Sequence, residues 1–194
     1  MAKLYFKYGA MGSSKTAQAL ITKFNYEERG MKVWLIKPAT DKRDGCDNLT
    51  SRIGLASKCD PIDKSDGIRE LFMRKILNAD VIICDESQFF TENQIDELRK
   101  IVDEDNIPVI CFGLRTDFLT RRFPGSKRLF ELADSISEIK TICECGSKAT
   151  VSARIDKSGN IVTSGEQIFL GVNDTYLAMC HKCWAERIKK QNER

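Results

Sequence analysis

Short apolar runs alternate with amphipathic segments along the first 140 residues. The apolar runs lie at 3–8, 32–37, 80–84 and 108–113, and the last two are almost continuous. A strand that is buried on both faces of a parallel sheet has this composition. The four runs therefore predict strands, and we expect the last two to be fully buried.

Helical periodicity separates these runs. Apolar residues recur at helical spacing after residue 16, and Gly30 is a suitable stop, so we expect the first helix to end near Arg29. Residues 39–60 are rich in Asp, Ser, Thr and Gly and predict a long loop. Three further helices are predicted, at 67–78, 91–104 and 127–134.

The order of these elements predicts the fold class. Strands that alternate with helices indicate βαβ units and a parallel, doubly wound sheet. The pattern changes near residue 141 to an alternating run (149–155), a turn at 157–160 and a polar helix at about 182–192. We therefore predict an α/β domain at 1–140, with helices flanking a parallel sheet, and a smaller domain at 141–194.

Composition and charge narrow the classes of protein. Of 194 residues, 42% are hydrophobic and 30% are charged, as in an ordinary globular protein. The net charge of +3 gives no support to a nucleic-acid or membrane-binding face. No apolar run approaches 18 residues, and the N-terminus, MAKLYFKYG, lacks the pattern of a secretion signal. We expect a cytoplasmic protein without nucleic-acid or membrane partners.

The segment between the first strand and the first helix predicts a phosphate-binding loop. Residues 9–16, GAMGSSKT, match G-x-x-x-x-G-K-[ST] except at Ser14, where the pattern has glycine. In such a loop, successive N–H groups surround phosphate oxygens, Lys15 reaches the β- and γ-phosphates, and Thr16 binds Mg²⁺. A simple glycine- and serine-rich turn is the alternative. Ser14 must adopt a backbone dihedral that serine tolerates, or it weakens nucleotide binding.

The apolar run at 80–84 is followed by Asp85 and Glu86. The acidic residue after such a strand often holds Mg²⁺, directly or through water, in proteins with a phosphate loop. Glu86 would lie at the carboxyl end of the sheet, where it could take a proton from an attacking oxygen. A solvated acidic turn is the alternative. The pattern leaves open whether the attacking oxygen belongs to water, as in an ATPase, or to a substrate, as in a kinase.

Eight cysteines are the unusual feature of the composition. Without a secretion signal, a disulfide framework is the poorer interpretation. Two close pairs near the C-terminus predict a closed, structural zinc site with four thiolate ligands, and buried structural thiols are the alternative. Two other cysteines lie in predicted strands as core residues, and two are loop thiols without an evident role. The two close pairs are Cys143 with Cys145 and Cys180 with Cys183. The cysteines in predicted strands are Cys84 and Cys111, and the loop thiols are Cys46 and Cys59.

Together these motifs resemble the type II thymidine kinases of bacteria. The likeness extends over nearly the whole chain, through LYFKYGAMGSSKT, SRIGL, VIICDESQF, IPVICFGLRTDF, GEQIFLG and CHKC. The resemblance implies transfer of the γ-phosphoryl group of ATP to the 5′-hydroxyl of thymidine or deoxyuridine, in nucleotide salvage. It also implies Mg²⁺ with ATP, a structural Zn²⁺, a homotetramer and feedback inhibition by thymidine triphosphate.

The resemblance also assigns roles to individual residues. Glu86 matches the general base, and the four paired cysteines match the zinc ligands. The positions on the side of ATP and Mg²⁺ are Gly9, Ala10, Met11, Gly12, Ser13, Ser14, Lys15, Thr16, Asp41, Arg43, Asp85 and Gln88. The positions around the nucleoside are Met11, Phe89, Leu114, Phe118, Phe123, Tyr176 and a lasso-like loop with Gln167, Ile168, Phe169, Leu170 and Gly171.

Two departures from the family pattern keep other functions open. Ser14 replaces a glycine of the phosphate loop, and Val172 stands where a second lasso glycine is common. One alternative is a P-loop ATPase module whose zinc knuckle docks a protein or nucleic acid. It leaves GLRTDF and the lasso unexplained. The other is a binding protein with an inactive phosphate loop.

Overall fold

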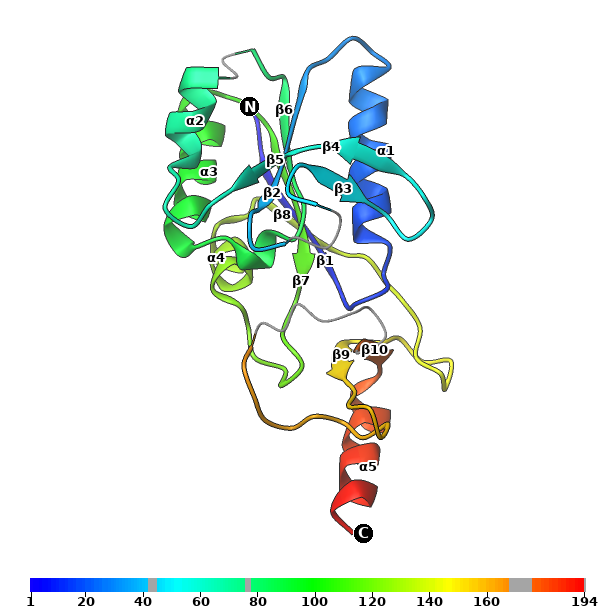
Figure 1. Cartoon of the computed structure of the whole chain (residues 1–194). Coiled ribbons are helices and arrows are strands. Elements are labelled where there is room, and N and C mark those ends of the chain that lie inside the picture. The colour runs from blue at the N-terminus through cyan, green and yellow to red at the C-terminus, as the bar shows by residue number, and fades with distance from the viewer. Residues whose placement is uncertain (42–44, 76–77, 168–175, 194) are drawn as a thin grey trace.

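A six-stranded parallel sheet forms the centre of the molecule (Figure 1). The computed structural model describes residues 1–41, 45–75, 78–167 and 176–193. The four predicted strands are confirmed as β1 (Leu4–Gly9), β2 (Val33–Pro38), β6 (Val81–Cys84) and β7 (Val109–Leu114). The strand order is β5-β2-β6-β7-β1-β8, and every neighbouring pair is parallel. The predicted α/β fold class is therefore confirmed.

Helices cover both faces of this sheet. Figure 1 shows α1 (Lys15–Glu27) on one side, with α2 (Ile68–Lys75), α3 (Glu92–Glu104) and α4 (Pro124–Leu132) on the other. Alternate residues of the four inner strands, β2, β6, β7 and β1, enter the two cores. On β6, Ile82 and Cys84 pack toward α2, α3 and α4, whereas Val81 and Ile83 pack toward α1. Burial on both faces explains the nearly continuous apolar run of this strand.

The helix ends follow local capping chemistry. Thr91 begins α3 with a capping box, in which its Oγ1 accepts a hydrogen bond from the Gln94 N–H and the Gln94 side chain accepts one from the Thr91 N–H, both 3.1 Å. The helix predicted at 127–134 begins three residues earlier, at Pro124. Proline fits the first position of a helix because its missing N–H has no partner there in any case.

The loop predicted at 39–60 is wrong in part. It contains a hairpin of β3 (Asn48–Thr50) and β4 (Ala56–Lys58), and β5 (Asp60–Ile62) joins the sheet edge. Leu49 is buried against α1 and the sheet. Strands of three residues are too short to show a period, so only tertiary contact reveals them. The same holds for β8 (Ser135–Glu138), a mostly polar edge strand beside β1 that the pattern did not predict.

The C-terminal segment has its own small core. β9 (Val151–Arg154) and β10 (Tyr176–Met179) form an antiparallel pair, followed by α5 (His181–Asn192). Their apolar residues cluster with the cysteines, separately from the sheet. The division into domains at residue 140 stays a prediction. Within the described residues, no helix has both the length and the apolar composition that crossing a bilayer requires.

Candidate active site

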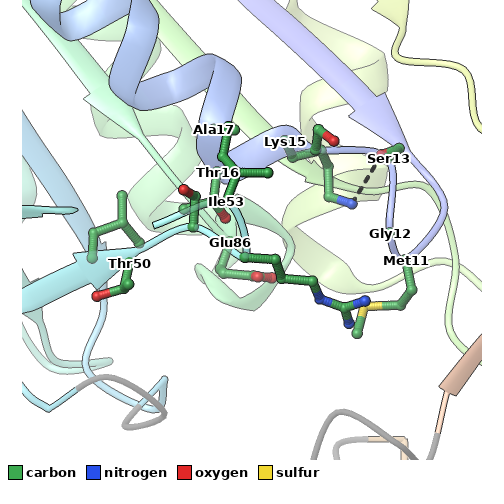
Figure 2. Close-up of a pocket in the computed structure, with 13 residues that line it drawn as sticks. Met11, Gly12, Ser13, Lys15, Thr16, Ala17, Thr50, Ile53 and Glu86 are labelled. Carbon is green, nitrogen blue, oxygen red and sulfur yellow. Dashed lines mark hydrogen bonds between the residues drawn. The ribbon is translucent and has the colours of Figure 1, made fainter. Parts of the chain in front are cut away.

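The segment after β1 folds as a tight loop around the ammonium of Lys15. Its Nζ donates hydrogen bonds to the carbonyl oxygens of Ala10 (2.8 Å) and Gly9 (3.4 Å) and to Ser13 Oγ (3.3 Å), and the side chain is buried (Figure 2). Gly9 permits this curvature, since a Cβ there would lie 2.5 Å from the carbonyl oxygen of Ile139. The ammonium is thus held where a phosphate-binding loop needs a positive charge.

Ser14, the mismatch in the loop pattern, adopts the left-handed conformation (φ 59°, ψ 28°). This region favours glycine and costs other residues about 1–2 kcal/mol. The Ser14 carbonyl still accepts the first hydrogen bond of α1, from the Gln18 N–H at 3.0 Å. Serine therefore keeps the loop backbone that the pattern requires.

A cavity of about 150 Å³ lies over the loop. One wall is formed by residues 11–17, and Glu86 also faces the space (Figure 2). Another wall comes from residues 49–53, at the end of β3 and in the turn that follows. Pockets for whole small ligands are usually about 300–1,000 Å³, so this space matches a phosphate chain. The SRIGL residues had no predicted role, although their motif carried part of the family resemblance.

Asp85 lies directly beyond β6, and its side chain is buried. Its Oδ2 accepts a 2.7 Å hydrogen bond from Thr16 Oγ1, while Oδ1 is buried without a partner among the described residues. Burial, and then the neighbouring charge of Glu86, raise the pKa of Asp85 to about 7, against the opposing hydrogen bond from Thr16. An unpartnered carboxylate oxygen beside a hydroxyl is a donor set that fits Mg²⁺.

Glu86 also has a left-handed backbone (φ 49°, ψ 34°). Strain of this kind is common at functional sites, where the surrounding structure maintains it. Gln88 Nε2 donates to Glu86 Oε2, and Gln88 Oε1 accepts from the Leu114 N–H at 2.9 Å. Gln88 was predicted on the side of ATP and Mg²⁺. The structure places its fully buried amide between Glu86 and the end of β7, where it orients the Glu86 carboxylate.

The predicted nucleoside residues gather around the loops after β6 and β7. Phe89 contacts Phe123 edge to face at 5.5 Å between ring centroids, and Phe118, Phe123 and Leu114 are buried. Strand β9 contacts another predicted member, Met11. Ser152 Oγ accepts a 3.0 Å hydrogen bond from the Met11 N–H. Ser152 was not predicted, because nothing in a single sequence relates it to the phosphate loop.

Two further contacts connect β9 and β10 with this group. The guanidinium of Arg154 lies 5.2 Å from the centre of the Phe118 ring, and Tyr176 is the strand partner of Arg154. Tyr176 is half-buried, and burial raises the pKa of its hydroxyl. Arg154 and Ser152 therefore connect the C-terminal segment with two of the predicted nucleoside residues, Phe118 and Met11.

Asp117 joins the loop after β7 to the predicted lasso. Its Oδ1 accepts hydrogen bonds from the N–H groups of Leu119 (2.9 Å) and Arg121 (2.8 Å), and its Oδ2 accepts one from Gln167 Nε2 (3.0 Å). Gln167 also donates to the Arg122 carbonyl oxygen at 3.4 Å. Asp117 was not predicted as a site residue, although it lies in the GLRTDF motif.

Asp41, predicted on the side of ATP and Mg²⁺, is not among the described residues that line the cavity. Asp41 is buried, and its N–H donates to the Pro38 carbonyl oxygen at 3.0 Å. Six positions lie outside the described residues, and they are Arg43, Ile168, Phe169, Leu170, Gly171 and the departure Val172.

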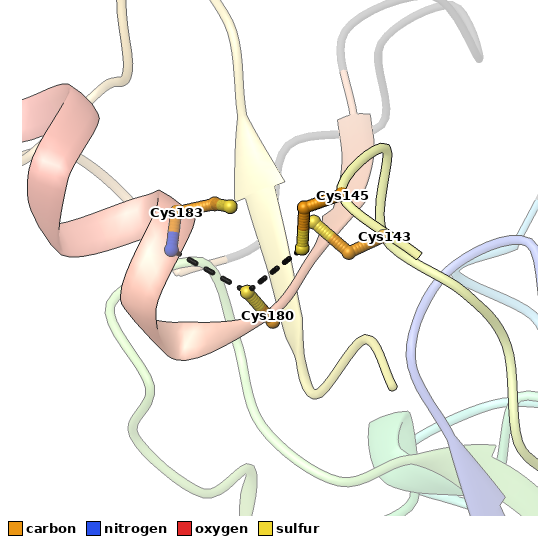
Figure 3. Close-up of side chains that lie close together, drawn as sticks. All are labelled: Cys143, Cys145, Cys180 and Cys183. Carbon is orange, nitrogen blue, oxygen red and sulfur yellow. Dashed lines mark hydrogen bonds between the residues drawn. The ribbon is translucent and has the colours of Figure 1, made fainter. Parts of the chain in front are cut away.

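The four paired cysteines converge on one point (Figure 3). All four Sγ atoms lie within 4.8 Å of one another, and those of Cys145 and Cys180 are 3.7 Å apart. A zinc tetrahedron with Zn–S distances of about 2.3 Å has S–S edges of about 3.8 Å. Gly146 (φ +82°) turns the chain after the first pair, and the Cys183 N–H donates to Cys180 Sγ at 3.4 Å. The cluster therefore fits a closed four-thiolate zinc site.

Comparisons with known proteins agree with this geometry. Residues 2–184 match the family model described as "Thymidine kinase". The thymidine kinase of Yersinia pseudotuberculosis serotype I (strain IP32953) is 41% identical over 191 residues, 97% of each chain. That of Idiomarina loihiensis is 43% identical over 190 residues, 96% of this chain and 97% of the relative. That of Legionella pneumophila (strain Lens) is 44% identical over 183 residues, 93% of this chain and 88% of the relative. The chain belongs to the thymidine kinase family, and it is an ATP-dependent phosphotransferase.

Proposed function

We propose that Glu86 is the general base for transfer of the γ-phosphoryl group of ATP to the 5′-hydroxyl of thymidine or deoxyuridine. One observation carries this assignment: Glu86 faces the cavity over the phosphate loop and is held there by Gln88. A carboxylate in this position can accept the proton of the nucleoside hydroxyl as its oxygen attacks phosphorus. The negative charge that moves to ADP then meets the positive surroundings of the phosphate loop.

On the ATP side, residues 9–16 bind the phosphate chain. The Lys15 ammonium is already surrounded by loop oxygens, so it can exchange a carbonyl acceptor for a phosphate oxygen with little movement. Thr16 and the unpartnered oxygen of Asp85 would hold Mg²⁺. When bound, Mg²⁺ supplies charge neutralisation for the β- and γ-phosphates. Asp41 and Arg43 are proposed to contribute near the phosphates, on the strength of the family resemblance.

On the nucleoside side, the aromatic group encloses the base. The residues proposed are Met11, Phe89, Leu114, Phe118, Phe123, Tyr176 and the stretch 167–171. Apolar and aromatic walls with few polar groups are typical of small-molecule sites. Exclusion of water from this space would suppress hydrolysis of ATP, because Glu86 could otherwise activate water as readily as a hydroxyl.

The family resemblance also supports proposals on assembly and regulation. These are a homotetramer, inhibition by thymidine triphosphate and a cytoplasmic location. The net charge of +3 supports the absence of a nucleic-acid partner. Light scattering on the zinc-loaded protein tests the tetramer, and a titration of the kinase reaction with thymidine triphosphate tests the inhibition.

The function is tested by incubating the protein with Mg-ATP and a panel of nucleosides. Both ADP and nucleoside monophosphate are followed. We expect equal amounts of the two products with thymidine or deoxyuridine. ADP release that ignores every nucleoside would support the ATPase module with a zinc knuckle. The absence of both products would support a binding protein with an inactive phosphate loop.

A further inference from the structure

Lys37, on β2, has a side chain with no exposed surface. Its Nζ donates hydrogen bonds to the carbonyl oxygens of Gly45 (2.9 Å) and Asn48 (2.7 Å). A lysine is almost never fully buried unless its ammonium is paired, because loss of hydration is costly. The buried charge is therefore satisfied by two backbone carbonyl groups, that of Gly45 and that of Asn48 at the start of β3.

Three carboxylates share the region of the Cys59 thiol with Lys37. Asp41, Asp47 and Asp60 act on the Cys59 thiol from the same region as Lys37, although burial is the main cause that raises its pKa, to about 11. The ammonium of Lys37 lies between β2 and residues 45–48.

The two acceptors of Lys37 flank the base of the β3–β4 hairpin. Asn48 is the first residue of β3, and the next residue, Leu49, is buried against α1. At the tip, the Ser51 N–H donates to the Leu55 carbonyl oxygen at 2.8 Å, and Ser51 Oγ accepts from the Leu55 N–H at 3.0 Å. The hairpin is thus closed at its tip and attached to the sheet at its base by the ammonium of Lys37.

The tip of the hairpin forms one wall of the phosphate cavity. Thr50, Ser51, Arg52 and Ile53 line the same space as Lys15 and Glu86. Arg52 is exposed and is the cation that this wall brings to the cavity. A guanidinium matches phosphate oxygens with two parallel hydrogen bonds, which a lysine cannot make.

We propose that Lys37 is a positioning residue for phosphoryl transfer, which acts through the β3–β4 hairpin by holding Arg52 against the triphosphate of ATP. This inference rests on the proposed function, because it assigns further residues to the same site. It predicts that Lys37 and Arg52 operate as one unit, although their side chains belong to different elements.

The test compares the steady-state kinetics of four variants of the full-length, zinc-loaded protein. These are Lys37→Met, which keeps chain length without charge, Arg52→Ala, the double variant, and Lys58→Met, an exposed lysine on the same hairpin as matched control. We expect Lys37→Met and Arg52→Ala each to raise KM for ATP by about 10- to 100-fold, the usual effect of losing a charge-assisted hydrogen bond. KM for thymidine stays within about twofold, and Lys58→Met behaves like the wild type.

The double variant decides whether the two residues act together. If Lys37 acts through the hairpin, KM for ATP in the double variant should stay within about twofold of KM in the single variant with the larger loss. Losses that multiply would overturn the connection between Lys37 and Arg52. Wild-type kinetics in Lys37→Met, or an equal rise in KM for both substrates, would overturn the positioning role.

Two outcomes require a further measurement, namely a Lys37→Met variant that does not fold and a wild type that does not phosphorylate thymidine. If Lys37→Met does not fold, Arg52→Ala alone remains decisive, because Arg52 is exposed, and an unchanged KM for ATP would overturn the inference. If the wild type does not phosphorylate thymidine, the proposed function fails. In that case the affinity of each variant for Mg-ATP, measured by calorimetric titration, still tests the hairpin. An affinity unchanged in Lys37→Met would then contradict the inference by itself.

Discussion

The hydroxyl of Thr16, in the first turn of α1, donates a 2.7 Å hydrogen bond to Oδ2 of Asp85, which directly follows β6. The other carboxylate oxygen, Oδ1, is buried without a partner among the described residues. Burial, and then the neighbouring charge of Glu86, outweigh the hydrogen bonding to this carboxylate, so the pKa of Asp85 rises to about 7. The nucleotide-free protein is therefore destabilised by the carboxylate that we propose as a Mg²⁺ ligand.

The first prediction concerns how the destabilisation of the folded protein by Asp85 depends on pH. The folded pKa lies above the ordinary value of 3.8, so below about pH 4 the carboxyl is neutral in both states and has no effect. From pH 4 to 7 the unfolded chain releases its proton first, and stability falls; above pH 7 the penalty is constant. Asp85→Asn should therefore raise the melting temperature of the nucleotide-free protein more at pH 8 than at pH 5.5.

The matched control is Asp156→Asn, since hydrogen bonds from Asn160 lower the pKa of Asp156. The effect of this control should have the opposite sign, a loss of stability at pH 8. The gain in the free energy of unfolding from Asp85→Asn should differ between pH 8 and pH 5.5 by a few kcal/mol at most, because one pKa unit is worth about 1.4 kcal/mol. Equal gains in melting temperature at both pH values would contradict the raised pKa.

The second prediction concerns Glu86. Glu86→Gln should keep the fold and the KM values but lower kcat by roughly 10²–10⁴-fold, the usual contribution of a general base. The control is Glu28→Gln, an exposed glutamate at the end of α1. Near-normal turnover in Glu86→Gln, measured under saturating substrates, would remove Glu86 from this role.

Gln88 offers an independent check on the same carboxylate. Gln88→Ala leaves Glu86 without the amide that ties it to the Leu114 N–H. We expect a smaller loss of kcat than in Glu86→Gln, because the base is present but less well oriented.

The third prediction concerns Ser14. In the left-handed conformation, serine costs about 1–2 kcal/mol, whereas glycine costs only its larger entropy in the unfolded chain, about 0.5–1 kcal/mol. Ser14→Gly should therefore raise the free energy of unfolding by up to about 1 kcal/mol without raising KM for ATP. Ser14→Val should lower it, since a β-branched residue fits this region worst. Urea denaturation measures both, and a stabilised Ser14→Val would contradict the strained backbone.

Much of the site could be predicted because its parts are contiguous in the chain. Residues 9–16 and the pair Asp85 and Glu86 each lie at the end of an apolar strand, and parallel strands bring such ends to one edge of the sheet. The cysteine pairs were also predictable, because the spacing within each pair suits a single metal ion. Periodicity and short motifs are local signals, and they located these elements correctly.

The remaining parts depend on contacts between distant segments. Lys37 reads as one polar residue in an apolar run, and its role appears only when the hairpin folds over it. Asp117 and Ser152 likewise act on residues 50 and 141 positions away in the sequence. No local pattern encodes such pairs, and the short strands of the hairpin give too few residues for a period.

The fourth prediction concerns the metal. Elemental analysis should find about one zinc per chain, and Cys145→Ser should lower that content. Among the described residues, the small core at the cysteines has six buried members, two of which are Cys143 and Cys180 themselves, so the metal should provide much of its stability. Chelation should then expose 141–193 to proteolysis before the sheet. The control is Cys46→Ser, an exposed thiol outside the cluster. A folded, active, metal-free protein would contradict the structural site.

The fifth prediction concerns Asp117, which holds both the loop after β7 and Gln167. Asparagine at this position keeps one acceptor and places an amide N–H₂ against a donor, so one of these connections is lost. Asp117→Asn should raise KM for thymidine by about tenfold, the effect of one lost hydrogen bond to a charged group. KM for ATP should not change, because the phosphate loop is held by other contacts.

A close control exists within the chain. Asp156 Oδ1 accepts hydrogen bonds from the N–H groups of Ser158 (2.8 Å) and Asn160 (2.9 Å), the same turn that Asp117 forms with Leu119 and Arg121. Asp156→Asn therefore perturbs the same local geometry away from the nucleoside residues, and it should leave both KM values unchanged. If Asp117→Asn raises KM for ATP and for thymidine equally, Asp117 does not act on the nucleoside side alone. If it changes neither KM, Asp117 has no role in binding the nucleoside.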